Sequence, residues 1–423
     1  MKKNIPLFLL IALITPSLQS TESEEPKEKI VEFTGYVNYK TFYDTRQVVG
    51  VTEDQTVFFP KPIDCSPTGD INAHGHLQML PFETRMRITL REPHKKYNFS
   101  CKGIIEVEFR GVQTLVNIVN MRHAFAQLDI RKTTLIFGQT WHTLNVEDLI
   151  PNTVSFNSGR PFAVYNRSPQ IRYTQHLSNI DIILSAASQV DFQSDGPVGL
   201  STTYIRNAII PNFDFQVKGF FGQHVVGTGI DYQRISPRQV SPQGYKVHED
   251  LSSVTGIWFL GLNWPKLTVK NTMMFGGNLS NYGVTGGYAV KKGSTDPITG
   301  QQKYTNIRTF TAWSDITVLP AQHIEPGVFL GISKNFGSAH EIEPTSVDPD
   351  SNPVLPTVYG LGTDINIMFR VSPRIRVKIG QVTFAGEIEY TRAAYGHLTN
   401  HGHVIHTAPV ANTQFLFSTF LFF

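Results

Sequence analysis

The chain has 423 residues, of which 17% are charged and 11% are aromatic, and its formal net charge is +3. Soluble proteins usually carry about 25% charged residues, so this chain is poor in charge for its length. The near-neutral balance argues against bulk nucleic-acid binding, and nothing after residue 20 is apolar for the roughly 18 residues that a membrane helix needs.

The first residues, 1–20, have the pattern of a secretory signal peptide. Two lysines are followed by an apolar run of about ten residues and then by small residues near Ser20. We therefore expect export across an inner membrane, with a short acidic leader over 21–30. The remainder, 31–423, is predicted to be one all-β domain, a transmembrane antiparallel β-barrel.

Stretches in which polar and apolar residues alternate predict about sixteen strands. The clearest is 82–92, where Arg85, Arg87 and Arg91 alternate with apolar residues. The predicted strands are 31–46, 82–92, 99–110, 114–128, 131–138, 169–177, 179–187, 200–208, 213–223, 253–264, 266–278, 304–318, 323–336, 357–371, 373–392 and 412–423. An even number of strands lets a barrel close with both ends on one side of the membrane.

Tight turns alternate with long connections along this series. The predicted tight turns are 129–130, Ser178, 209–212, Pro265, 319–322 and Ser372, and the long connections are 139–168, 188–199, 224–252, 279–303, 337–356 and 393–411. One tight turn, 111–113, falls on the side where long loops are expected. Short periplasmic turns and long extracellular loops are typical of bacterial outer-membrane barrels.

The final segment, 412–423, carries no charge and ends in Phe423. Phe415, Phe417 and Leu421 fall on one side of a strand, which indicates a side facing lipid. The alternative is a buried hairpin strand of a soluble sheet.

Basic residues recur on the predicted strands. A barrel of about sixteen strands encloses an aqueous channel, so the inward side chains decide what passes. The predicted pore-lining residues are Arg85, Arg87, Arg91, Arg110, Arg122, Arg172, Arg370, Arg374 and Arg376. Guanidinium groups in a narrow wet channel attract anions and bind carboxylates bidentately. The alternative is that these arginines only fill the wall, paired with Glu83, Glu106, Glu108, Glu387 and Glu389.

The predicted loop 139–168 is unusually apolar for a solvated segment. Folding into the barrel would bury its apolar groups and narrow the channel, with two acidic residues facing the arginines. The predicted constriction residues are Trp141, Glu147, Asp148, Phe156, Arg160 and Arg167. The alternative is a loop that packs against its neighbours outside the barrel.

Short motifs resemble the DcaP-like trimeric porins of Gram-negative bacteria. They are 122–126 (RHAFA), 138–141 (GQTW) and 166–173 (NRSPQIRY), and the resemblance covers mainly 82–175 and the terminal Phe. It implies a sixteen-stranded homotrimer in the outer membrane that admits small organic anions such as dicarboxylates. By position, Arg122 and Arg172 would line the channel and the loop at Trp141 would narrow it. The chain lacks the N-terminal coiled coil that some members carry.

Other candidate sites are weaker. The last predicted loop holds His397, His401, His403 and His406, but no acidic or cysteine partner lies near them in the sequence, so we expect no metal. The only candidate for catalysis, His176 with Ser178, falls at a tight turn, so we expect no enzyme. Cys65 is expected in an outer loop and Cys101 near the inner end of a strand, too far apart for a disulfide.

These patterns predict a passive outer-membrane porin for small hydrophilic solutes that favours small organic anions. We expect its partners to be those anions, the lipid bilayer and further copies of the chain, with no cofactor. Two alternatives stay open. One is an outer-membrane barrel that acts as an adhesin or receptor through its long loops. The other is a secreted soluble β-protein that binds polysaccharide.

Overall fold

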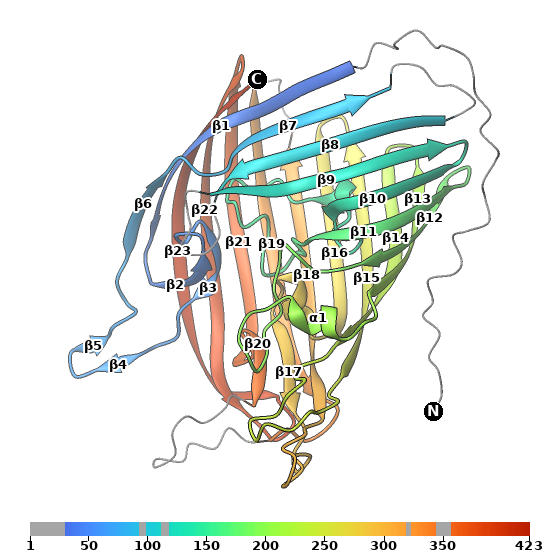
Figure 1. Ribbon diagram of the computed structural model, residues 1–423. Helices are drawn as coiled ribbons and strands as arrows, with labels where there is room; N and C mark the ends of the chain where they lie inside the picture. Colours follow the sequence, from blue (N-terminus) through green and yellow to red (C-terminus); the bar gives the residue numbers. More distant parts are fainter. Residues whose placement is uncertain (1–29, 93–98, 111–117, 319–322, 344–356) are drawn as a thin grey trace, which may run out of the picture.

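The computed structural model describes residues 30–92, 99–110, 118–318, 323–343 and 357–423. Nearly all strands in these segments belong to one antiparallel sheet that closes on itself (Figure 1). The predicted signal peptide, all but the last residue of the acidic leader, and the predicted turns at 111–113 and 319–322 lie outside the described residues.

The wall has sixteen strand positions, because β6 and β7 follow one another along β1 and occupy a single position. The wall strands are β1 (Ile30–Asp44), β6 (His76–Leu80), β7 (Thr84–Arg91), β8 (Phe99–Phe109), β9 (Val119–Ile130), β10 (Thr133–Trp141), β11 (Arg167–His176), β12 (Ile180–Ala187), β13 (Asn212–Phe221), β14 (His224–Ile235), β15 (Leu251–Trp264), β16 (Leu267–Gly277), β18 (Tyr304–Val318), β19 (Ile324–Ser338), β21 (Ile365–Ile379), β22 (Val382–Leu398) and β23 (Val404–Phe422). The predicted antiparallel barrel is confirmed.

The long connections contain the remaining elements. They are β2 (Val48–Val51), β3 (Thr56–Pro60), β4 (Cys65–Ser66), β5 (Gly69–Asp70), β17 (Gly286–Val290), β20 (Val358–Leu361), the short helix α1 (Thr203–Asn207) and the 3-10 turns η1 (Glu147–Leu149) and η2 (Leu279–Tyr282). Most of these elements lie toward the lower end of the barrel in Figure 1, opposite the end where the chain terminates. No helix in the described segments is long and apolar enough to cross a membrane.

The first and last strands close the barrel. Tyr43 lies opposite Phe415, and Val37 lies opposite Leu421. At the end of the pair, Gly35 N donates to Phe423 O over 3.0 Å. The first strand therefore pairs with the last, as closure of the predicted barrel requires.

The two faces of the wall differ in polarity. On β23, Phe415, Phe417 and Leu421 are between 44% and 48% exposed, whereas Gln414 and Ser418 on the opposite face are buried. Other strands also direct large apolar side chains outward. A soluble protein would bury such a surface, but a barrel in the outer membrane places it in hydrocarbon. The secreted soluble alternative is therefore wrong.

Two sequence predictions between β12 and β15 are wrong. The predicted strand 200–208 is a loop that contains α1, and β14 lies in the predicted loop 224–252. The glycines of β14 resemble loop residues in the sequence, but they make room for neighbours. A Cβ on Gly227 would lie 2.2 Å from the ring of Phe259.

The predicted turn at Ser372 is also wrong. Strand β21 continues through Ser372, whose buried hydroxyl donates to Glu387, and the chain turns instead at Gly380, where φ is +61°. Because β22 and β23 extend further than predicted, the expected loop 393–411 shrinks to 399–403.

Replacing Gly35 by alanine is expected to weaken barrel closure by about 1–3 kcal/mol, the usual cost of overpacking. A Cβ at Gly35 would lie 2.2 Å from the backbone oxygen of Arg85 and 2.8 Å from the ring of Phe423. Gly386→Ala is the matched control, because its new Cβ would lie 3.9 Å from the nearest atom, the Leu416 oxygen. Urea unfolding in lipid vesicles measures the difference. Equal unfolding midpoints for the two variants would contradict the tight closure.

Candidate functional site

The segment 142–166 between β10 and β11 folds into the barrel, and we call it the inward loop. Its backbone is hydrogen-bonded to side chains of the wall. Arg370 donates to Arg160 O over 2.6 Å, and Thr311 donates to Phe162 O over 3.0 Å. Phe162 also packs on Phe329, with 6.3 Å between ring centroids. The loop therefore reaches wall strands far from its own ends.

Buried carboxylates of β22 hold the same loop. Glu387 accepts hydrogen bonds from the backbone N–H groups of Val154 and Ser155, the second over 3.0 Å. Glu389 accepts from the side-chain amide of Asn157 over 2.5 Å. These contacts satisfy loop N–H groups that would otherwise be buried without a partner, and such orphans are costly.

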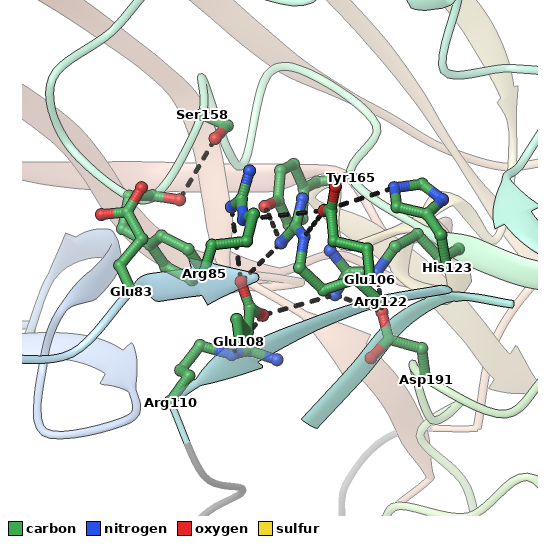
Figure 2. A network of polar contacts seen from close by, with 12 residues as sticks. Glu83, Arg85, Glu106, Glu108, Arg110, Arg122, His123, Ser158, Tyr165 and Asp191 are labelled. Atoms are coloured by element: carbon green, nitrogen blue, oxygen red, sulfur yellow. Dashed lines mark hydrogen bonds and ion pairs between the residues drawn. The ribbon is translucent and has the colours of Figure 1, made fainter. Parts of the chain in front are cut away.

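Charged side chains from β7, β8, β9, the start of β11 and nearby loops form one network, which we call the arginine network. Its members are Arg85, Arg87, Arg110, Arg122, Arg160, Arg167, Glu106, Glu108 and Asp191. Arg122 lies at its centre (Figure 2). This guanidinium is 2.7 Å from Glu106, 2.6 Å from Glu108 and 3.0 Å from the Tyr165 hydroxyl.

The period of the strands explains this arrangement. Arg85 lies directly opposite Glu108 on β7 and β8, and Arg87 lies opposite Glu106. Because side chains two apart on a strand share a face, all four point into the barrel. Opposite charges across adjacent strands attract, and the Arg87–Glu106 pair is 2.5 Å apart.

The arginine network carries excess positive charge, since six guanidinium groups face three carboxylates. Arg167 pairs with Asp191 at 2.7 Å, and Arg110 pairs with Glu108 at 3.2 Å. Among the described residues, Arg160 makes no ion pair, although its side chain is only 1% exposed. Its guanidinium lies 4.3 Å from the ring centroid of Tyr165. Burial lowers the pKa of Arg160 to about 9, which leaves it charged at neutral pH.

Comparison with solved structures identifies the fold. The chain matches the outer-membrane channel DcaP of Acinetobacter baumannii with a TM-score of 0.65 and 12% identity, over 93% of this chain and 97% of that one. It matches an anion-selective porin from Comamonas acidovorans with a TM-score of 0.55 and 9% identity, over 94% of this chain and 100% of the other. The fold is that of the outer-membrane porins. No family model and no curated protein sequence matches the chain.

The porin fold confirms the resemblance that the sequence motifs indicated, at the level of architecture. OmpT of Vibrio cholerae shares it as well, with a TM-score of 0.53 and 10% identity over 95% of this chain and all of that one. All these identities are low, so the comparisons establish the fold and leave the selectivity to be argued from the residues of this chain.

The other predicted arginines lie outside the arginine network. On β21, Arg370 pairs with Glu389 at 3.0 Å, Arg374 with Asp315 at 2.9 Å and Arg376 with Glu325 at 3.2 Å. Arg376 also donates to the backbone of the inward loop. Arg91 lies near the end of β7, where its exposed side chain pairs with Glu32 at 3.0 Å. The ion pairs of these four arginines agree with the alternative from the sequence, in which arginines pair with carboxylates and fill the wall.

The acidic residues of the inward loop do not face the arginine network. Glu147 lies 3.6 Å from Arg172, and Asp148 lies 2.7 Å from Lys218. Glu147 therefore pairs with one of the predicted pore-lining arginines, on β11, whereas Asp148 pairs with a lysine of β13. Trp141 has the guanidinium of Arg122 5.4 Å from its ring centroid, and Phe156 has that of Arg110 at 5.2 Å.

Sequence reasoning missed two partners of these arginines. Asp191 lies in a loop without periodic pattern, so nothing in the sequence placed it beside Arg167. Asp315 was accessible to prediction, because Trp313, Asp315 and Thr317 share the inward face of one alternating strand and all three are buried.

Proposed function

We propose that this porin fold forms a passive outer-membrane channel for small hydrophilic solutes, with a preference for small organic anions. The observation that carries the proposal is the surplus of guanidinium groups beside the inward loop. Two unit charges 4 Å apart interact by about 1 kcal/mol in water and about 4 kcal/mol near a protein surface. Three surplus positive charges beside the inward loop therefore favour anions and repel cations.

A cavity beside the network supports this proposal. It has a volume of about 510 Å³, and its lining includes Arg110 and Arg160 together with Asn120, Phe192, Asp191 and Asp195. Sites for small molecules commonly have volumes of about 300–1,000 Å³. Arg160 has no carboxylate partner among the described residues, so it is the member of the network best able to attract a carboxylate solute.

The structurally similar proteins also support an anion preference and a trimeric assembly. One of them is described as anion-selective, and OmpT of Vibrio cholerae was also solved in a trimer form. We infer that this chain assembles as a homotrimer and that its solutes include small carboxylates.

Replacing Arg160 by glutamine is expected to lower the chloride-to-potassium permeability ratio about fivefold, the effect of about 1 kcal/mol. The measurement is the zero-current potential of single channels in planar bilayers under a KCl gradient. Arg91→Gln is the matched control, because it removes the same charge from an exposed ion pair near the end of β7. Equal shifts for the two variants would show that Arg160 does not guide ions.

The alternative of an adhesin or receptor with a blocked barrel makes a different prediction. Liposomes that contain the folded protein should swell in isotonic small sugars, and faster in a dicarboxylate salt than in the salt of a diamine of similar size. An absence of swelling with every solute would favour the blocked barrel. Faster swelling with the diamine would contradict the anion preference.

A further inference from the structure

A second buried cluster of ionisable groups lies outside the arginine network. His142 is the first residue of the inward loop, Asp214 lies on β13 and Asp231 on β14. All three are buried, and one donor atom of each lies within 4.8 Å of the others. His142 Nε2 is 3.7 Å from Asp214 Oδ2. The fold thus brings an imidazole and two carboxylates to one point inside the barrel.

Neither carboxylate forms an ion pair with a lysine or arginine of the described segments, although Arg172 interacts electrostatically with Asp214. Asp214 and Asp231 lie directly opposite each other on adjacent strands, where like charges repel. A buried charge is normally paired or bound to a metal. Asp214 Oδ1, Asp231 Oδ2 and His142 Nε2 also have no hydrogen-bond partner in the described segments.

We propose that His142, Asp214 and Asp231 bind a divalent transition-metal ion such as Zn²⁺ or Mn²⁺. One imidazole nitrogen and two carboxylate oxygens are ligands that such ions accept, and the ion supplies a positive charge in contact with both carboxylates. The three unpartnered atoms belong to the three proposed ligands. This site is independent of the proposed solute selectivity.

Neighbouring side chains hold the carboxylates in place. The Tyr282 hydroxyl donates to Asp231 Oδ1, and Ser185 Oγ donates to Asp214 Oδ2 over 2.7 Å. Hydrogen bonds of this kind orient metal ligands and strengthen binding. Asp214 Oδ1 and Asp231 Oδ2 are the oxygens that these bonds leave available to an ion.

The imidazole must change its tautomer to take part. His142 Nδ1 accepts a long hydrogen bond of 3.3 Å from the backbone N–H of Leu144, which places the ring proton on Nε2. Binding through Nε2 moves that proton to Nδ1 and gives up the bond to Leu144. The ion then joins the start of the inward loop to β13 and β14, so it stabilises the position of the loop.

The full-length mature protein, folded in detergent and stripped with a chelator, tests the proposal. After addition of Zn²⁺ or Mn²⁺ and removal of the excess, elemental analysis should find about one ion per chain, with a raised melting temperature. Asp231→Asn and His142→Gln should each weaken binding by at least about tenfold. The double variant His401→Ala, His403→Ala should retain the ion, which controls for the histidines of the loop 399–403.

Three results would overturn the proposal: no retained ion, equal binding by wild type and Asp231→Asn, or loss of the ion only in the histidine-loop variant. If no ion is retained, a proton shared between Asp214 and Asp231 would reduce the negative charge of the pair instead. Asp231→Asn removes one of two facing carboxylates, so its melting temperature in chelator should equal or exceed that of the wild type. If this variant fails to fold, His142→Gln decides the question.

Discussion

Replacing Arg122 by alanine is expected to destabilise the folded barrel by about 3–5 kcal/mol, the usual cost of removing one partner from a buried ion pair. Arg122 is bonded to both Glu106 and Glu108, and all three side chains are nearly inaccessible to solvent. Without this guanidinium, two carboxylates stay buried with weaker compensation. Urea unfolding in lipid vesicles, followed by tryptophan fluorescence, measures the change.

Arg91→Ala provides the control for this prediction. Its ion pair with Glu32 has a similar separation, 3.0 Å, but the two side chains are 54% and 47% exposed. Exposed pairs contribute about 0–1 kcal/mol, so this variant should unfold almost like the wild type. A small effect for both variants would mean that the arginine network is well hydrated and does not stabilise the wall.

Replacing Arg370 by alanine is expected to release the inward loop. Besides pairing with Glu389, Arg370 donates to the backbone oxygens of Arg160, Val57 and Phe58, over 2.6, 3.3 and 3.0 Å. Its removal breaks these bonds and leaves Glu389 buried without its cation, which costs about 3–5 kcal/mol. Single-channel recordings should show a larger mean conductance with frequent transitions between levels.

Arg374→Ala separates loop release from simple loss of stability. Arg374 lies on the same strand in a similarly buried pair with Asp315, but its hydrogen bonds go to Asp315 and Thr317 on the wall. This variant should be destabilised without a comparable rise in conductance. Equal conductance changes in the two variants would contradict the role of Arg370 as an anchor of the loop.

The sequence was most informative where side-chain alternation was strict. The pattern of 82–92 predicts a strand with Arg85 and Arg87 on one face, and in the structure both arginines point into the barrel opposite carboxylates of β8. The uncharged final segment is likewise predicted to be a strand with one side in lipid, and the exposed Phe415, Phe417 and Leu421 agree with that prediction.

Prediction failed where tertiary contacts decide the local structure. Strand β14 contains glycines, which in the sequence indicate a loop. The structure explains Gly227, because a side chain there would collide with the ring of Phe259 on the next strand. Glu147 was expected to face the arginines and lies 3.6 Å from Arg172, one of the predicted pore-lining residues, whereas Asp148, expected to do the same, pairs with Lys218. The surplus positive charge of the arginine network could not be predicted from the sequence either. Asp191 and Arg160 lie in loops whose paths depend on contacts between residues distant in sequence.

The most direct test of the account is the zero-current potential of the wild-type channel in a planar bilayer under a KCl gradient. The surplus of guanidinium groups in the arginine network predicts a potential displaced toward the equilibrium potential of chloride. A potential displaced toward that of potassium, or no conductance from protein shown to be folded, would contradict an anion-favouring channel.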